Sequence, residues 1–335
     1  MECQDTQMKM MRVPINTQGD DLFLNRLLSY LNAQFPFQMV NIKPIRRNVF
    51  ILQTTWSDTF ILKGFPTYHR LRKQERLTAD LKEHGFLKTY SFLHYAKNPP
   101  LYFNGQYYGL LQHIIPSEDI FTFHGSENQE EGLAILEKFH ETTGKFIHGY
   151  KRDLDKYKIV KKWNERTAAF TNNSSLLRFF VKQEVIDEIL SWADWSLTNL
   201  EKDLPLRNEA EVILHGDVAH HNFLRSESGE LFLIDFDLIS IGKPSSDYLQ
   251  YANRILPYLN WSFEGLSNLK GMQHFLSDKG FLYGLVYPTD IFREWNRLVR
   301  ERNYENPLKV RRVLDYIMGQ FHERQYFVQE IKKLV

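Results

Sequence analysis

The sequence predicts an α+β fold of two lobes, a small N-terminal lobe with an antiparallel sheet and a helix, and a larger, mainly helical C-terminal lobe. Three observations lead to this prediction. Short β-type runs are concentrated before residue 116, helical periodicity dominates after it, and one strand–loop–hairpin segment interrupts the helices. A chain of 335 residues is long enough for two hydrophobic cores. We therefore place the lobes at residues 1–115 and 116–335.

The expected elements of the N-terminal lobe follow one another without a long linker. An apolar run with acidic residues at its start predicts the first helix. Two apolar runs separated by a polar turn predict two strands, and a basic segment with Leu77 and Leu81 on one face predicts a helix that Gly85 ends. These elements, with two further strand-like runs, are a helix at 20–31, strands at 49–52 and 59–63, a helix at 69–84, and strands at 90–94 and 107–115.

Helices dominate the expected C-terminal lobe. Ser126 and Gln129 have the spacing of a capping box, which predicts a helix through Phe139 and His140. Apolar residues at helical spacing predict a long helix over residues 181–204. Between the two apolar runs at 212–214 and 231–234, the polar segment 226–229 predicts a hairpin turn. Further helices are expected at 246–259 and from 291 to the end of the chain.

The composition is that of an ordinary globular protein, with 43% hydrophobic and 25% charged residues. Lys and Arg number 42 and Asp and Glu number 41, so the net charge of +1 gives no reason to expect binding to nucleic acid or an anionic membrane. The single cysteine, Cys3, cannot form an intrachain disulfide, which favours a reducing, cytoplasmic setting. We expect no signal peptide and no membrane-spanning helix, which would need roughly 20 apolar residues.

The segment with the most chemical information lies at residues 212–237. An apolar run leads into a loop with Asp217, Asn222 follows five positions later, and a short hairpin delivers Asp235 from a second apolar run. Transfer of a γ-phosphoryl group needs an oriented hydroxyl, in-line geometry and neutralised phosphate charge. A carboxylate base and two oxygen ligands on magnesium provide these. The pattern therefore makes phosphoryl transfer the leading hypothesis.

Three histidines in the same segment leave a second interpretation open. His215, His220 and His221 lie near Asp217 and Asp235 in the sequence, and a hydrolase that binds zinc or another transition metal would use such residues. Neighbouring histidines on a short loop cannot easily point at one ion, however, and the chain has no spaced pair such as H-E-x-x-H. Magnesium held by oxygen ligands is therefore favoured.

The same residues resemble those of a known family. The runs His-Gly-Asp217-x-x-x-x-Asn222 and Ile-Asp235-Phe-Asp237 are similar to the catalytic and metal-binding segments of the aminoglycoside phosphotransferase and choline kinase family, which shares the protein kinase fold. The resemblance extends from about residue 40 to residue 255, and the helix that ends in Phe139 and His140, together with the catalytic loop, resembles the spore-coat-associated, CotS-like bacterial branch. Further matching positions are Lys63, Glu75, the run 110–115, Phe139, His140 and Asp247.

The resemblance implies a role for each matching residue. Asp217 would accept or orient the proton of the substrate hydroxyl, and Asn222 and Asp235 would hold magnesium. Lys63, paired with Glu75, would grip the α- and β-phosphates of ATP. His215 and Asp247 are the residues that this fold uses to brace the catalytic loop.

Two more residues are assigned to the nucleotide. Gln112 lies in the strand that resembles the approach to the interlobe hinge, and Arg46 lies in the loop between the first two strands, where nucleotide-binding proteins of this fold carry glycine. Residues 45–49 contain no glycine, and no Gly-rich phosphate motif occurs elsewhere in the chain. Either Arg46 or Arg47 contacts the phosphates by charge, or this loop stays back from them.

The acceptor pocket is expected in the helical lobe beside Asp217. An aromatic lining could hold an amine by cation–π attraction, although aromatic residues at helical spacing also build cores. The candidates are Tyr248, Tyr251, Tyr258, Trp261 and Phe263, with Trp163 and Arg166.

The resemblance implies a phosphotransferase that uses ATP and magnesium to phosphorylate a hydroxyl of a small molecule. The short segment between Asp237 and Pro244 supports a small acceptor, because it leaves little room for a loop that docks a protein substrate. The alternative is a kinase-fold structural protein without activity, for example one that binds spore-coat proteins. The missing loop glycines favour this alternative, and the intact Asp217, Asn222 and Asp235 oppose it.

Overall fold

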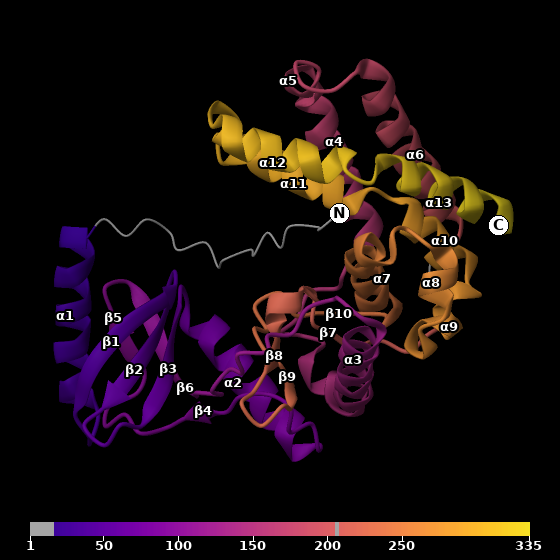
Figure 1. Ribbon diagram of the computed structural model, residues 1–335. Helices are drawn as coiled ribbons and strands as arrows, with labels where there is room; N and C mark the ends of the chain where they lie inside the picture. Colours follow the sequence, from indigo (N-terminus) through magenta and orange to yellow (C-terminus); the bar gives the residue numbers. More distant parts are fainter. Residues whose placement is uncertain (1–16, 205–207) are drawn as a thin grey trace. The chain divides into compact units, whose positions relative to one another are not determined.

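The computed structural model describes residues 17–204 and 208–335, so the prediction about Cys3 lies outside the described residues. The chain divides into two compact units, which end and begin at Pro116 and Ser117 (Figure 1). The first unit carries an antiparallel sheet and the second is mainly helical, which confirms the predicted α+β fold. Within the described part of the chain, no helix is long and apolar enough to cross a membrane.

The first unit is built on an antiparallel sheet with the strand order β1-β2-β3-β6-β4, and β5 pairs with β6 at one end. Strand β5 was not expected, because three residues are too few to show a period. The elements of this unit are α1 (Thr17–Gln34), β1 (Met39–Arg46), β2 (Val49–Thr54), β3 (Thr59–Phe65), α2 (Tyr68–Glu83), β4 (Phe92–Leu93), β5 (Leu101–Phe103) and β6 (Gln106–Gln112).

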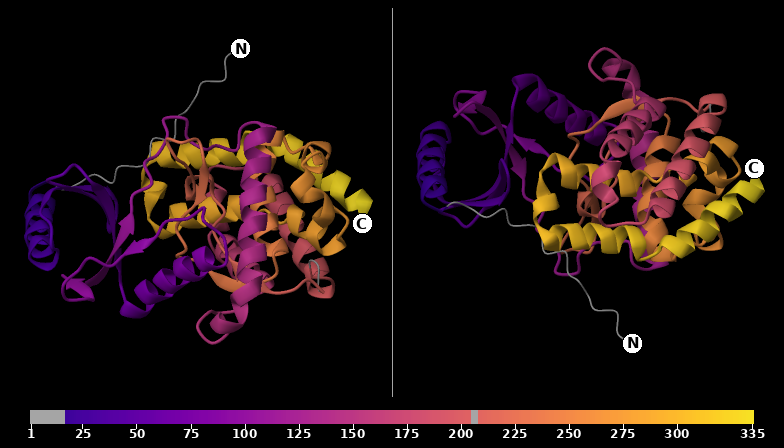
Figure 2. Two further views of the ribbon diagram at one scale, coloured as in Figure 1. Left: turned by 90° about the horizontal axis from the view of Figure 1, so that it is seen from below. Right: turned by 90° about the horizontal axis from the view of Figure 1, so that it is seen from above.

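The two helices of the first unit pack against opposite faces of this sheet, as Figure 2 shows for α1. Leu27 and Leu31 of α1 are fully buried in one hydrophobic cluster with Leu62 of β3. Because successive strand residues point to opposite faces, Lys63 lies on the other face, toward α2. Helix α2 closes this face, and its C-terminal stop at Gly85 is confirmed by a φ of +91°.

The second unit is a packed set of helices with two small β-pairs. Helix α6 packs on α10, and α4 packs on α11. Helix α4 was not predicted, although α6 and α7 lie close to their expected positions. The helices are α3 (Ser126–Phe146), α4 (Ile159–Asn172), α5 (Ser174–Leu177), α6 (Gln183–Lys202), α7 (Ser245–Ile255), α8 (Phe263–Ser267), α9 (Lys270–Leu276), α10 (Lys279–Val286), α11 (Thr289–Arg300), α12 (Pro307–Met318) and α13 (Phe321–Leu334).

The capping box predicted at the start of α3 is wrong. The N-cap residue is Gly125, with a φ of +78°, and no side chain caps this end. Gln129 instead donates a hydrogen bond of 2.8 Å to the carbonyl of Phe123. Because Ser126 is already the first helical residue, its hydroxyl is one position too late for the reciprocal pair of bonds.

Two short β-pairs carry the chemical segment. Strand β7 (Val212–Leu214) pairs with β10 (Ser240–Gly242), and β8 (Phe223–Arg225) pairs with β9 (Leu231–Leu233). The predicted hairpin turn is confirmed at Gly229, where φ is +80° and the amide donates to the carbonyl of Ser226 at 2.8 Å. The pairing of β7 with β10 holds both ends of the chemical segment together and leads directly into α7.

Candidate active site

The second residue of the loop after β7 is a glycine that no other residue can replace without strain. Gly216 has a φ of +79°, and a Cβ atom at this position would lie 2.3 Å from the carbonyl oxygen of Leu238. Both conditions exclude an ordinary side chain. The chain therefore turns sharply here, and Asp217 follows at the turn.

Asp247, near the start of α7, fixes this turn by hydrogen bonds to its backbone. Its carboxylate accepts hydrogen bonds from the backbone amides of His215 at 2.7 Å and Gly216 at 3.0 Å. The Nε2 atom of His140 on α3 lies 3.0 Å from the same carboxylate. Burial alone would raise the pKa of Asp247, but its bond to His140 and the charge of that ring outweigh burial, so its pKa is lowered. The expected brace of the catalytic loop by Asp247 is confirmed.

The side chain of His215 connects the two halves of the chemical segment. Its Nε2–H group donates to the carbonyl of Ile234 at 3.0 Å, and its Nδ1 atom accepts from the amide of Asp217 at 3.3 Å. These two bonds require the neutral ring with its proton on Nε2. Both ring nitrogens are therefore engaged in bracing, which confirms the structural role expected for this residue.

Asn222 lies between the loop of Asp217 and the strand end that carries Asp235. The side-chain Nδ2 atom donates to the backbone carbonyl of Asp217 at 2.7 Å. The backbone carbonyl of Asn222 accepts from the amide of Ile234 at 2.9 Å. Its Oδ1 atom is buried and has no hydrogen-bond partner among the described residues. A buried acceptor without a donor is costly, and a cation can satisfy it.

Asp235 directly follows Ile234, so the chain brings it next to Asn222. It adopts a φ of +71°, a left-handed conformation that L-residues rarely take. The side chains of Asn222 and Asp235 carry an amide oxygen and a carboxylate. Magnesium prefers such ligands and takes its remaining ligands from water and substrate phosphate. The residues present therefore fit the expected ion.

The Asp217 side chain is in contact with a residue that the sequence did not single out. Arg254 on α7 donates from Nη2 to Oδ1 of Asp217 at 2.6 Å, and the two side chains are 20% and 31% exposed. A signal for this contact existed, because Arg254 follows Asp247 by seven positions and therefore lies on the same face of α7. Asp217 thus has one oxygen in an ion pair.

In the first unit, the predicted pair of Lys63 and Glu75 is not formed. The Lys63 ammonium donates to Oε1 of Gln74 at 3.3 Å, and Tyr90 reaches the same oxygen at 3.4 Å. Gln74 belongs to the buried face of α2, whereas the Glu75 carboxylate lies beside Arg72 and, at 3.2 Å, beside Nδ1 of His94. Gln74 lies on the same buried face of α2 as Leu71 and Thr78, so Gln74 and not Glu75 meets the lysine.

The two other expected nucleotide residues lie at strand ends. Arg46 ends β1, and only Arg47 and Asn48 separate it from β2. Asn48 adopts a φ of +59° and accepts a hydrogen bond of 2.7 Å from the amide of Gly64. The glycine-free loop is therefore a tight turn fastened to β3. Gln112 ends β6 with an exposed side chain.

The family of the chain follows from comparison with known proteins. Residues 43–264, well over half of the chain, match the model of the phosphotransferase enzyme family that includes the aminoglycoside phosphotransferases. The chain belongs to this family. No curated protein matches this chain by sequence.

Solved structures show the same kinase-like fold. An aminoglycoside phosphotransferase from Alicyclobacillus acidocaldarius subsp. acidocaldarius DSM 446 is 16% identical, with a TM-score of 0.67 and coverage of 90% of this chain and 94% of that one. Spectinomycin phosphotransferase APH(9)-Ia, in complex with ADP and spectinomycin, is 15% identical, with a TM-score of 0.61 and coverage of 92% and 96%. Amicoumacin kinase hAmiN, in complex with AMP-PNP and Ca²⁺, is 13% identical, with a TM-score of 0.58 and coverage of 93% and 97%.

The remaining histidines of the segment 212–237 form no metal-binding group with the other described residues. His220 is half-buried, with its ring centroid 6.1 Å from that of Phe123, and burial followed by the charges of His221 and Arg254 lowers its pKa. His221 and Asp237 are exposed. Among the described residues, no group of three or more His, Cys, Asp or Glu side chains could hold a metal ion.

Most of the aromatic residues expected in the acceptor pocket belong to the core of the helical unit. Tyr248, Tyr251 and Trp261 are at most 5% exposed. The cation over the Trp261 ring is the guanidinium of Arg324, 3.8 Å from the ring centroid. Of the five aromatic candidates after residue 247, only Tyr258 is exposed. Of the two roles that the sequence left open for these three residues, burial favours the role in the core over the lining of an amine pocket.

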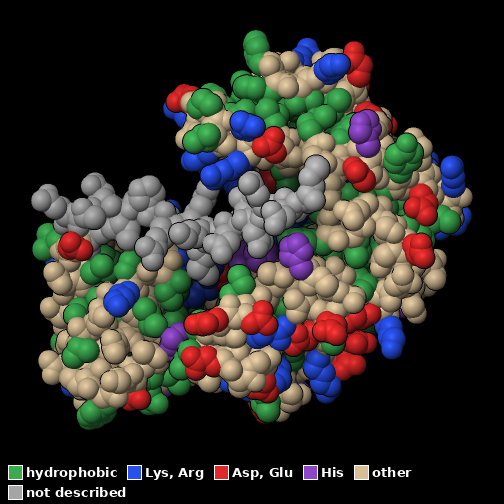
Figure 3. Space-filling view, viewed as in Figure 1, with side chains coloured by type: hydrophobic (Ala, Val, Ile, Leu, Met, Phe, Trp, Pro, Cys, Tyr) green, Lys and Arg blue, Asp and Glu red, His purple; other side chains and the backbone are tan. Residues whose placement is uncertain are grey.

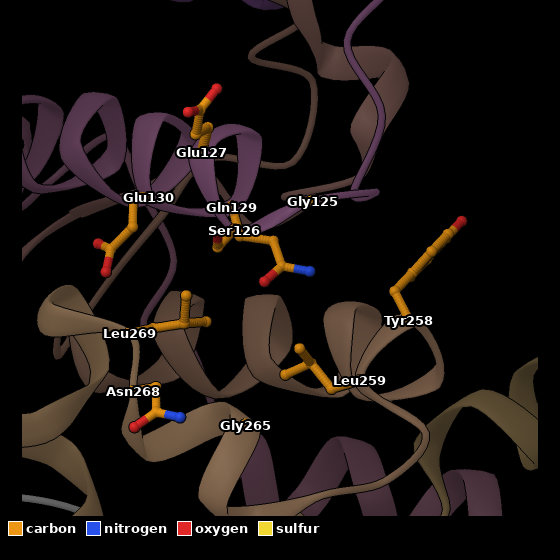
Figure 4. A pocket seen from close by; sticks show the side chains of 10 residues that line it. All are labelled: Gly125, Ser126, Glu127, Gln129, Glu130, Tyr258, Leu259, Gly265, Asn268 and Leu269. Atoms are coloured by element: carbon orange, nitrogen blue, oxygen red, sulfur yellow. The ribbon is translucent and has the colours of Figure 1, made fainter.

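One cavity of the helical unit lies away from the catalytic loop. The cavity, of about 530 Å³, opens between the start of α3 and the segment 258–269. Acidic side chains gather on the surface over α3 (Figure 3). Gln129, Leu259 and Leu269 point into the cavity, and Glu127 points away (Figure 4). Neither Asp217 nor the other catalytic-loop residues line this cavity, so it is not the site of the chemistry.

Proposed function

We propose that the protein is a small-molecule kinase that uses ATP and magnesium to phosphorylate a hydroxyl group. One observation carries this proposal, the position of the Asn222 side chain. Its amide group donates to the backbone of Asp217, and its buried oxygen is left without a donor. A buried side-chain oxygen that accepts no hydrogen bond can serve as a ligand of a metal ion, and Asp235, which directly follows Ile234, supplies a second oxygen ligand.

The residues of the loop suit the parts of phosphoryl transfer. The substrate hydroxyl oxygen forms a bond to the γ-phosphorus, the bond from that phosphorus to the bridging oxygen of the nucleotide breaks, and the hydroxyl proton passes to the carboxylate of Asp217. Arg254 holds Oδ1 of Asp217, so Oδ2 is the oxygen available for the proton. Asn222 and Asp235 would hold magnesium, which supplies charge neutralisation on the phosphates when bound.

Lys63 is the residue proposed to contact the α- and β-phosphates. The side-chain oxygen of Gln74 accepts a hydrogen bond from the ammonium group of Lys63 and helps to fix the position of that group. Related structures contain ADP, GDP or AMP-PNP, so GTP needs to be compared with ATP. Arg46 and Gln112 are proposed as further nucleotide contacts. Glu75 is proposed to affect the position of Lys63 only indirectly, through its contacts on α2.

A thermal-shift titration with ATP and magnesium, followed by measurement of ADP release with candidate acceptors, tests the proposal. We expect stabilisation by the nucleotide that depends on magnesium in the wild type. In Asp217→Asn we expect the same stabilisation and no transfer, and in Asp235→Asn we expect stabilisation without magnesium dependence. The absence of any nucleotide-dependent shift at millimolar ATP and GTP would disprove the kinase function.

A second candidate, a kinase-fold protein without activity, is favoured by one observation. The loop over the expected phosphate site is the tight turn at Arg47 and Asn48, which is fastened to β3 by the bond from Gly64. A turn of this kind presents few free backbone amides to phosphate. Nucleotide binding without ADP release for any acceptor, and with no effect of Asp217→Asn, would support this candidate.

A further inference from the structure

Four cationic side chains from the helices α4, α7 and α11 form a cluster near Asp217. Lys162 and Arg166 lie one turn apart on α4, and Arg254 and Arg293 come from α7 and α11. The helices are packed together, since α11 contacts both α4 and α7. None of these four residues belongs to the sequence motifs discussed above, except that Arg166 was an acceptor-site candidate.

A chain of contacts leads from the catalytic loop to these residues. Arg254 is bonded to Asp217 at 2.6 Å. On the other side, β10 pairs with β7 and its Ile241 carbonyl accepts a bond of 2.7 Å from the amide of Tyr157. The Lys162 ammonium lies 4.9 Å from the centroid of the Tyr157 ring. The cluster therefore adjoins the proposed base and is fixed to the same strands.

The cluster has more positive than negative charge. Asp217 pairs with Arg254, and Glu294 pairs with Arg293 at 3.0 Å. Within the described chain, no carboxylate oxygen lies within 4.0 Å of the side-chain nitrogens of Lys162 or Arg166.

The polar contacts of these two residues are with neutral groups. Arg166 donates to the Thr289 hydroxyl at 2.7 Å, and Lys162 faces the Tyr157 ring. The other nearby carboxylates have partners outside the cluster, since Asp247 binds His140 and the loop backbone and Asp290 pairs with Arg324. Two half-buried cations therefore lack an ionic partner.

The electrostatics of the cluster agree with this geometry. Burial, followed by the charge of Arg166, lowers the pKa of Lys162 to about 8, although Asp217 and Asp247 act in the opposite sense. Burial and the charge of Arg293 lower the pKa of Arg254 to about 10. The Nε atom of Arg254 is also buried without a hydrogen-bond partner among the described residues. A bound anion would relieve each of these costs.

We propose that the acceptor carries an anionic group, a carboxylate or a phosphate, beside the hydroxyl that is phosphorylated, and that Lys162 and Arg166 bind this group. The inference rests on the proposed kinase function and names its substrate class. Arg254 and Arg293 add to the positive potential, and the planar guanidinium of Arg166 suits either anion by two parallel hydrogen bonds. The charge preference is opposite to that needed for an aminoglycoside, whose amines are protonated at neutral pH.

Anion binding is tested first without turnover. Inorganic phosphate and malonate are titrated separately into the wild type at constant ionic strength by calorimetry, and saturable binding of at least one is expected. Lys162→Gln with Arg166→Gln should weaken it at least tenfold, and Arg166→Lys should weaken it less. The matched control is Lys161→Gln, because Lys161 lies on the same helix with its side chain 70% exposed.

Phosphate could also bind in the first unit, so Lys63→Gln is titrated in parallel. Anion binding that survives in Lys63→Gln and fails in the double variant supports the proposal. Binding of neither anion by the wild type, or binding lost in Lys63→Gln and kept in the double variant, overturns it. Circular dichroism of the variants establishes that they are folded.

Turnover then distinguishes the two anions and separates this inference from the kinase function itself. Glycerol, glycerate and glycerol phosphate share one scaffold and differ in charge, and kanamycin supplies the cationic case. Faster ADP release with glycerate or glycerol phosphate than with glycerol identifies the carboxylate or the phosphate as the preferred group. Preferred turnover of kanamycin or glycerol overturns the anionic acceptor and leaves the kinase function standing, whereas a missing nucleotide-dependent thermal shift removes the kinase function.

Discussion

Arg254 donates a hydrogen bond of 2.6 Å to one carboxylate oxygen of Asp217, and both side chains retain some contact with solvent. The guanidinium thus fixes the carboxylate in one orientation and leaves its second oxygen free. Because both side chains keep partial contact with solvent, the ion pair is screened and contributes only about 1 kcal/mol to the free energy of unfolding. Its importance is therefore expected in the orientation of the proposed base and much less in stability.

Arg254→Gln is expected to lower kcat at least tenfold, because the Asp217 carboxylate is then free to rotate away from the hydroxyl. The melting temperature should change little, and Arg254→Lys should restore part of the activity. Arg297→Gln is the control, because Arg297 also pairs with a carboxylate, that of Glu294, but is 54% exposed at the end of α11. Unchanged kcat in Arg254→Gln would exclude the orienting role.

Gly216→Ala is expected to destabilise the protein strongly and to abolish transfer. The left-handed backbone alone costs about 1–2 kcal/mol for an L-residue, and the new methyl group would meet the carbonyl of Leu238 at 2.3 Å. Gly229→Ala is a matched control, since Gly229 has a φ of +80° and nothing within 4 Å of the added atom. Chemical denaturation of both variants should show the larger loss for Gly216. Equal losses would mean that the clash is relieved by a local shift.

Asn222→Ala is expected to remove the magnesium dependence of nucleotide binding. Without the nucleotide, the variant should lose only about 1 kcal/mol of stability, which corresponds to the single side-chain hydrogen bond to Asp217. Calorimetric titration of magnesium in the presence of ATP measures the first effect, and urea denaturation measures the second. A variant that keeps magnesium-dependent binding would remove Asn222 from the proposed ligand set.

Gln74→Ala is expected to weaken ATP binding about tenfold, because the amide no longer holds the Lys63 ammonium, a loss of about 1.4 kcal/mol. Glu75→Ala should change ATP affinity less than twofold, since its carboxylate is occupied by Arg72 and His94. Competition with a fluorescent nucleotide compares the two variants directly. The reverse order of effects would restore Glu75 as the partner of the lysine.

Lys162→Met is expected to stabilise the protein at neutral pH. Because folding lowers the pKa of Lys162 from 10.5 to about 8, the unfolded chain binds more protons between these values. The stability of the wild type therefore rises with pH across this window, and the cost of the buried charge is fully present below about pH 8. Melting curves from pH 7 to pH 10.5 should show that the advantage of the variant shrinks. Lys161→Met, the exposed control, should show no such trend.

Part of the fold and site could be predicted because the necessary signals are local. The chain between Asp217 and Asn222 is a short loop, so their spacing alone places them near each other. The elements of the first unit are long enough to show their periods, as α2 does through Leu77 and Leu81. Strand β10, with three residues, is too short for such a signal, and its pairing with β7 was missed.

Other features depend on tertiary packing that no local pattern reveals. Whether Gln74 or Glu75 faces Lys63 depends on the rotation of α2 by one residue, which the packing of the helix on the sheet decides. In the sequence, Lys162 of α4 and Arg293 of α11 are more than a hundred residues apart. On an amphipathic helix, Lys162 cannot be told from its solvated neighbour Lys161 by type or spacing.

The hydrogen bonds of His215 have a consequence for the order of events during binding. This ring ties the loop of Asp217 to the carbonyl of Ile234, and Asp247 fixes the loop backbone from α7. The loop is therefore ordered by the protein itself, so little conformational entropy remains to be lost there when a nucleotide arrives. Amide protons at Gly216 and Asp217 should exchange slowly before any ligand is added, and nucleotide binding should leave their exchange rates nearly unchanged.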